Sequence, residues 1–168
     1  MAEVAVYVST YGKYNSGSLK GRWLELKNYP NKEAFIEACK NLHSDEKNPE
    51  IMFQDYENIP QSLIGETWIS DECWDILDWD EDSLEAFNYF ANYYGEDANI
   101  EKFEQKYLGK YDNEESFAEE WFQQQGYLEK IPQEFHDIID YERYSNILFS
   151  SGFWSSENKG DGCYVFMD

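Results

Sequence analysis

Carboxylates are the side chains in this sequence with the spacing to do chemistry, and two kinds of site use them. Asp78, Asp80 and Asp82 have the spacing of the first three ligands in an EF-hand calcium loop. Ser83 stands where that loop needs Gly, however, and Tyr89 stands where it needs Glu, so we expect no calcium site there. Glycosidases use two carboxylates held about 5 to about 9.5 Å apart, a distance that the sequence alone does not set.

Other catalytic and metal-binding patterns are missing. His43 and His136 have no local Cys, Ser or HExxH context, so we expect structural or surface histidines. No Gly-rich phosphate loop is present. Cys39, Cys73 and Cys163 are widely spaced and odd in number, which predicts free buried thiols rather than disulfides or a zinc site. We therefore expect no cofactor, no metal and no catalytic residue.

The acids are unusual in another way, because many of them lie in one segment without bases. Residues 48–101 contain fifteen Asp and Glu residues and no Lys, Arg or His, in a chain of net charge -22. An ordinary solvated helix face mixes Glu with Lys. A surface without bases repels nucleic acid and anionic membranes and favours basic partners. Solubility, or adaptation to high salt, is the simplest alternative interpretation of the charge.

The spacing of these acids predicts a binding surface. A 4-3-4-3 spacing, which would place side chains on one face of an unbroken helix, relates Asp71, Asp75, Asp78, Asp82 and Glu85. Such a row has one charge per roughly 5 Å, against ~3.4 Å per phosphate along one DNA strand, so imitation of a duplex needs further rows. The predicted binding-surface acids are Glu66, Asp71, Glu72, Asp75, Asp78, Asp80, Glu81, Asp82, Glu85, Glu96 and Asp97.

The elements that precede these acids predict a small α+β unit over residues 1–60. Strands are indicated by alternating apolar residues, and a helix by an i, i+4, i+7 stripe behind an Asn cap. The predicted elements are a strand around Val4 to Val8, a loop over residues 11–18, a strand over 19–26, a helix over 32–42 capped by Asn31, and a strand over 51–56.

From residue 61 the pattern is helical. Ser70 is placed to cap a helix that begins with acids, and a second helix carries an apolar stripe from Leu84 to Tyr94 and stops at Gly95. The aromatics of this segment are expected to face inward. The remaining predicted elements are a helix from Asn99 to Leu108, a helix capped by Asp112 and ended by Gly126, a short helix from Pro132 to Ile139, and a terminal hairpin over residues 149–156 and 163–167 around Asn158 and Lys159.

Several stretches together resemble the ArdA antirestriction family over essentially the whole chain. The most specific are residues 6–17 with 21–24, residues 52–60 and residues 138–144. Residues 144–148 depart from the family pattern, because Tyr-Ser-Asn-Ile-Leu replaces Tyr-Ala-Arg-Asp-Leu. The family's antirestriction motif corresponds to residues 107–119, and its matching positions here are Tyr107, Tyr111, Glu114, Glu115, Phe117 and Ala118.

The resemblance implies an elongated α+β protein of three small domains, over residues 1–60, 61–103 and 104–168. It implies a homodimer formed through the C-terminal region, which imitates bent duplex DNA in the groove of type I restriction-modification enzymes. Neither direct nucleic-acid binding nor membrane binding is expected. The absence of a signal-peptide pattern or of a run approaching 18 apolar residues predicts a cytoplasmic protein.

Two other functions remain as alternatives. An acidic adaptor that binds another basic DNA-associated protein would use the same surface without protecting DNA from cleavage. A hydrolase would lose turnover on replacement of one or two carboxylates, whereas a surface that imitates DNA would lose inhibition gradually as several acids are neutralised.

Overall fold

The computed structural model describes residues 3–156 and 160–168 and contains helices and two antiparallel three-stranded sheets. This confirms the predicted α+β class. Contacts divide the chain into two compact units, residues 1–100 (the first unit) and 101–168 (the second unit). The expected domain boundaries near residues 60 and 103 stay predictions. Within the described ranges, no helix is long and apolar enough to cross a membrane.

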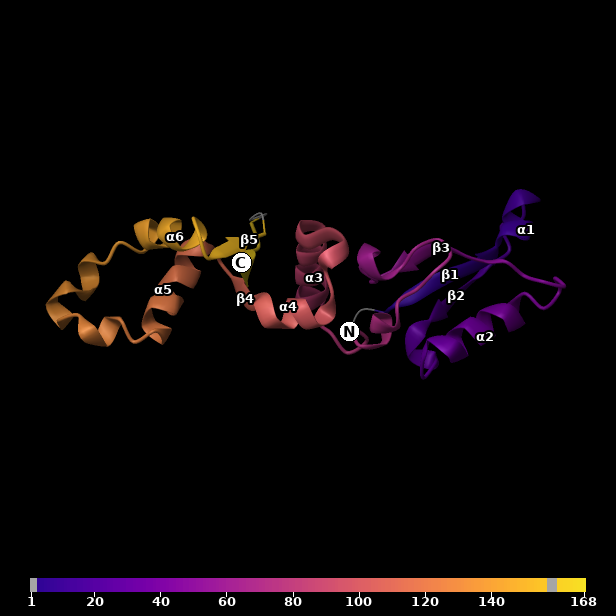
Figure 1. Cartoon of the computed structure of the whole chain (residues 1–168), viewed down its shortest axis with the longest axis horizontal. Helices are drawn as coiled ribbons and strands as arrows, with labels where there is room; N and C mark the ends of the chain where they lie inside the picture. The colour runs from indigo at the N-terminus through magenta and orange to yellow at the C-terminus, as the bar shows by residue number, and fades with distance from the viewer. Residues whose placement is uncertain (1–2, 157–159) are drawn as a thin grey trace. The chain divides into compact units, whose positions relative to one another are not determined.

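The first unit contains a sheet with strand order β2-β1-β3. Its strands are β1 (Ala5–Thr10), β2 (Arg22–Glu25) and β3 (Ile51–Glu57), and α2 (Lys32–Leu42) runs alongside them (Figure 1). The fully buried ring of Phe35 in α2 lies 5.9 Å from the ring of Phe53 in β3, which joins the helix to the sheet. The backbone N–H of Ala34 donates to Asn31 Oδ1 at 2.9 Å, so the predicted cap of α2 is confirmed.

Two predictions for the N-terminal region are wrong in detail. The expected loop contains α1 (Tyr11–Asn15), which begins because Thr10 Oγ1 accepts from the backbone N–H of Lys13 at 3.2 Å. The second strand is shorter than residues 19–26, since only Arg22–Glu25 pair with β1. A 3-10 turn, η1 (Leu26–Asn28), follows that strand and buries Leu26.

The acidic segment folds as short helical pieces. They are η2 (Gln61–Leu63), η3 (Asp71–Trp74), α3 (Glu81–Tyr94), η4 (Gly95–Asp97) and α4 (Ile100–Lys106). The Ser70 cap is confirmed, because its Oγ accepts from the backbone N–H of Glu72 at 3.2 Å. Gly95 ends α3 with φ of +59°, a left-handed conformation that favours glycine.

Trp74 attaches this segment to the N-terminal part of the first unit. Its indole N–H donates to the backbone oxygen of Tyr29 at 2.9 Å, and its ring lies 5.9 Å from Phe35. Phe87 and Phe90 of α3 are fully buried and stack with ring centroids 6.2 Å apart. These contacts give the acidic segment an aromatic core of its own while its carboxylates face outward.

The second unit contains a sheet with strand order β4-β6-β5 and two helices that pack together. Phe117, Cys163 and Val165 are its buried core, and Trp121 and Phe153 pack against them. The elements of this unit are β4 (Tyr107–Tyr111), α5 (Glu114–Gln124), η5 (Leu128–Lys130), η6 (Gln133–Ile138), α6 (Tyr141–Phe149), β5 (Phe153–Ser155) and β6 (Cys163–Met167) (Figure 1).

Predictions for the second unit were partly wrong. The helix from Asn99 was expected to reach Leu108, but β4 begins at Tyr107 because it pairs with the distant strand β6. Asn113 rather than Asp112 caps α5, since its Oδ1 accepts from the backbone N–H of Ser116 at 2.8 Å.

The C-terminal hairpin is confirmed as the β5–β6 pair, although it is shorter than expected. Helix α6 was not predicted, and it includes Phe149, which was expected to begin the hairpin. The helix starts at Tyr141 because Asp140 Oδ1 accepts from the backbone N–H of Arg143 at 2.9 Å. The predicted turn residues Asn158 and Lys159 lie outside the described residues.

Candidate functional site

The predicted binding-surface acids, called here the acidic set, all lie in the first unit and face solvent. Ten of the eleven are exposed, and Glu72 is half-buried. Glu66 follows η2, two acids lie in η3, two lie in the turn after η3, Asp80 caps α3, three lie in the first five residues of α3 and two lie in η4. The acidic set is therefore presented by several short elements.

The single helical face suggested by the 4-3-4-3 spacing does not form. Residues 71–74 are a 3-10 helix, residues 75–78 are a turn, and α3 starts only at Glu81. The break arises at Asp80, whose backbone is extended and whose Oδ1 accepts from the backbone N–H of Ser83 at 2.7 Å. An Asp in that position begins a helix rather than continuing one. The evenly spaced row of charges is thus replaced by separate clusters.

Some members of the acidic set help to hold the fold. Asp80 caps α3, and Glu72 Oε1 accepts from the backbone N–H of Ile100 at 3.2 Å. Acids in the first turns of η3 and α3 also suit the positive end of the helix dipole. The carboxylates of this segment therefore act in the fold as well as at the surface.

Lys32, which lies outside the segment, reaches the acidic set. Lys32 Nζ of α2 lies 3.7 Å from Asp71 Oδ2. The segment, which has no base of its own, thus receives a positive charge from another element. The Asp71 side chain remains 77% exposed, and an exposed pair at this distance contributes little. The negative field of the segment is reduced at Asp71 without being cancelled.

Not all aromatics of the segment face inward as expected. Trp68 is 50% exposed and Tyr93 is 58% exposed. Sequence reasoning missed Trp68 as a candidate binding residue. The feature of the sequence that could have indicated Trp68 is Gly65, three residues earlier, because a glycine permits close approach of a large ring.

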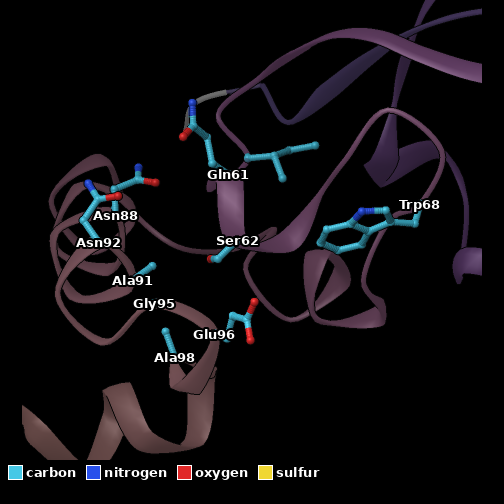
Figure 2. Close-up of a pocket in the computed structure, with 10 residues that line it drawn as sticks. Gln61, Ser62, Trp68, Asn88, Ala91, Asn92, Gly95, Glu96 and Ala98 are labelled. Carbon is cyan, nitrogen blue, oxygen red and sulfur yellow. The ribbon is translucent and has the colours of Figure 1, made fainter.

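Trp68 lines an open groove of about 870 Å³ on the first unit (Figure 2). The groove lies between η2, the loop that carries Trp68, α3 and η4. Its lining combines one carboxylate, three side-chain amides, a hydroxyl and an indole with small apolar side chains. The lining residues are Ile59, Gln61, Ser62, Trp68, Asn88, Ala91, Asn92, Gly95, Glu96 and Ala98. Only Glu96 among them belonged to the predicted site.

The antirestriction-like motif has its buried residues in the core of the second unit. Phe117 and Ala118 of α5 are buried, and the Tyr111 ring lies 5.0 Å from the Phe117 ring. Tyr107 of β4 packs 5.4 Å from Phe166 of β6. These four motif residues join β4, α5 and β6, so replacing them would disturb the fold.

The two motif carboxylates differ from each other. Glu114 Oε1 accepts from Ser155 Oγ at 2.7 Å, which ties α5 to β5. Glu115 is exposed. Glu115 is thus the motif residue whose charge can be changed with the least effect on packing.

The cysteine thiols and histidine rings, which could supply covalent or metal chemistry, are buried or contact backbone oxygens. Burial raises the pKa of the Cys39 and Cys73 thiols to about 12, which keeps them protonated. His43 is buried with Nε2 3.3 Å from the backbone oxygen of Val8, and His136 Nε2 lies 2.8 Å from the backbone oxygen of Ile131. These contacts support structural roles for both histidines. Among residues 3–156 and 160–168, no group of three or more His, Cys, Asp or Glu is arranged to hold a metal ion.

Comparison with protein families identifies a match over most of the chain. The model of a family described as "Antirestriction protein (ArdA)" matches residues 6–160. No curated protein matches the chain. The matched range covers most of both units and includes the acidic set, the groove and the antirestriction-like motif.

Proposed function

The chain belongs to the ArdA antirestriction family, and we propose that it acts by occupying the DNA-binding groove of a type I restriction-modification enzyme. Membership of the family implies an antirestriction function. The observation that carries the proposed mechanism is the acidic set, which is exposed on a segment of 54 residues with no Lys, Arg or His. The protein would be an inhibitor without a catalytic step.

The proposed mechanism is electrostatic. Lysines and arginines in a DNA-binding groove normally meet phosphates and release counterions. Carboxylates of the acidic set would take the place of those phosphates. Because counterion release and charge complementarity both weaken with ionic strength, inhibition should weaken as salt rises.

Because the helix is broken, the acids are spread over η3, the turn after it and α3 rather than along one straight row. Asp75 and Asp78 lie in the turn, whereas Glu81 begins α3. Glu72 and Asp80 are held by backbone N–H groups, so their carboxylates are fixed in position. Fixed charges lose less conformational entropy on binding than mobile ones.

We further propose that the protein acts in the cytoplasm as a homodimer formed through the second unit. Large apolar side chains exposed on that unit, including Ile138 at 74% and Ile147 at 60%, support this arrangement. Light scattering should give twice the 20.0 kDa mass of one chain. A single-chain mass at micromolar concentration would contradict it.

The decisive test is cleavage of unmodified DNA by a type I restriction enzyme with increasing amounts of the protein, at low and high salt. Asp75→Asn with Asp78→Asn should raise the concentration needed for half-protection several-fold. The matched control is Glu33→Gln with Glu37→Gln, which makes the same charge change on exposed positions of α2. This control should have the smaller effect.

Three outcomes would contradict the proposal. Absence of protection by the unaltered protein, in excess at low salt and across several type I enzymes, would reject the inhibitor. Capture of a basic DNA-associated protein without any protection would favour the acidic adaptor. Equal effects of the two double variants would show that net charge acts rather than this surface.

A further inference from the structure

We propose that the groove lined by Trp68 and Glu96 receives an arginine side chain of the protein partner. This inference rests on the proposed function for the identity of the partner, which supplies a basic DNA-binding groove. It adds a specific receptor to a surface that otherwise acts by distributed charge.

Gly65 fixes the position of Trp68. The backbone N–H of Gly65 donates to the backbone oxygen of Trp68 at 2.9 Å, and Ile64 pairs with Ile69 across the same tight loop. A Cβ at Gly65 would lie 2.2 Å from Trp68 Nε1, so only glycine allows the indole to rest there. Half of the Trp68 side chain stays exposed, and the ring borders the groove in Figure 2. The loop therefore presents a positioned aromatic surface.

The opposite side of the groove supplies polar groups. Asn88 and Asn92 are one helical turn apart on α3, which places them on the same face. Gly95 ends α3 and turns the chain into η4, from which Glu96 projects toward the side where Trp68 lies (Figure 2). Gln61 contributes a third amide from η2. A carboxylate and three side-chain amides thus line the same groove as the indole.

Ser62, which also lines the groove, has a buried hydroxyl with no hydrogen-bond partner among the described residues. A buried hydroxyl without a partner carries a desolvation cost.

A guanidinium group fits this combination better than the other common side chains. It is planar, can stack on an indole, and carries five N–H donors for carboxylate and amide oxygens. A lysine ammonium is a compact charge with three donors and no plane to stack. Ile59, Ala91 and Ala98 provide apolar contacts for the methylene stem of an arginine.

Charge favours arginine over a neutral ligand that would use the same indole and amides, such as a sugar. The groove lies wholly within residues 59–98, where the chain has no Lys, Arg or His. Glu96 therefore lies within a segment whose only charged side chains are negative. A neutral ligand gains nothing from that field, whereas a cation does.

The inference can be tested with short peptides on the full chain. The signal is the indole N–H resonance of Trp68 in tryptophan labelled with ¹⁵N, assigned by its loss in Trp68→Phe. The probe is acetyl-Gly-Arg-Gly-amide, and the matched probes replace Arg with Lys or with citrulline, which has nearly the same shape but no charge. We expect a saturable shift with Arg, at least fivefold weaker binding with Lys, and no shift with citrulline.

Two variants separate the groove from the general field. Glu96→Gln should weaken binding of the arginine peptide at least fivefold. Glu33→Gln, which makes the same charge change on α2, should leave it within twofold. Equal weakening by the two variants, or an equal shift with citrulline, would overturn the inference. A saturable shift with methyl glucoside and none with the arginine peptide would replace it with a carbohydrate site.

DNA protection by the same variants distinguishes this inference from the proposed function. If the unaltered protein protects DNA but binds no arginine peptide, or if Glu96→Gln abolishes peptide binding without weakening protection, the receptor role fails alone. If the peptide binds as expected but the unaltered protein protects no DNA, the proposed function fails and an arginine-binding groove remains. Loss of both activities in Glu96→Gln, with an unchanged amide spectrum elsewhere, supports both.

Discussion

The ammonium group of Lys32 lies 3.7 Å from the carboxylate of Asp71, so a segment with no base of its own receives one from helix α2. Removing that cation by Lys32→Gln should strengthen inhibition at low salt, by up to about fivefold, because no positive charge then lies beside the Asp71 carboxylate. The free energy of unfolding should fall by less than about 1 kcal/mol, since the pair is exposed.

Lys47→Gln is the matched control for this change, because Lys47 is exposed and its replacement alters net charge by the same amount. DNA protection and urea unfolding would be measured for both variants at low and high salt. If both variants strengthened inhibition equally, net charge rather than the Lys32–Asp71 pair would be responsible. The difference should disappear at high salt, where exposed charges are screened.

Asp80 combines a helix cap with a surface charge, and two substitutions separate these roles. Asp80→Asn keeps a capping oxygen for the backbone N–H of Ser83 but removes the charge. Asp80→Ala removes both and should lower the free energy of unfolding by about 0.5–2 kcal/mol. In DNA protection at a temperature where both variants are folded, the two should weaken inhibition similarly. A large stability loss in Asp80→Asn would contradict the cap assignment.

Gly65→Ala should displace the Trp68 indole, because the added Cβ would lie 2.2 Å from Trp68 Nε1. We expect a changed Trp68 indole N–H resonance and at least fivefold weaker arginine-peptide binding. Gly152→Ala is the control, since its Cβ would make an ordinary contact of 3.8 Å with the backbone oxygen of Leu148. An unchanged Trp68 resonance in Gly65→Ala would show that the indole is not held against this glycine.

Phe117 tests the structural role of the antirestriction-like motif. Because this ring is buried in the core of the second unit, Phe117→Ala should cost about 3–5 kcal/mol and increase amide exchange in β4, α5 and β6. Glu115→Gln, an exposed motif position, should leave amide exchange unchanged. Native-like exchange in Phe117→Ala together with lost DNA protection would instead assign Phe117 a direct contact with the target.

The cysteines predict how the protein responds to thiol reagents and to high pH. Burial raises the pKa of Cys39 and Cys73 to about 12 and that of Cys163 to about 11. At pH 8 the thiolate fraction of the first two is on the order of one in ten thousand, so iodoacetamide should react only after unfolding. Rapid labelling of the folded protein would contradict their burial.

The same pKa shifts predict the direction of a stability change. The folded state holds these thiol protons more tightly than the unfolded state, because each folded pKa is raised. Their contribution to stability is therefore complete below the ordinary thiol pKa and is lost as pH rises toward about 12. Alanine variants of Cys39 and Cys73 should show a smaller fall in unfolding free energy over that range.

The local features of this protein follow from short stretches of sequence. Asn31 and Ser70 cap helices, and Gly95 stops α3, because each acts on backbone groups within a few residues of itself. The absence of bases from residues 48–101 is likewise complete in the sequence and fixes the negative field of that segment. These features needed no knowledge of distant contacts.

Tertiary structure decided the rest, because it depends on residues that are far apart in the chain. Strand β4 forms since β6 pairs with it, and Lys32 reaches Asp71 since α2 packs in the same unit. The groove needs Trp68 and Glu96, which 27 intervening residues separate, to lie around one space. Sequence alone thus determined that this surface is negative, and folding decided which acids are held by backbone groups, that Lys32 reaches Asp71, and where an indole and a carboxylate line one groove.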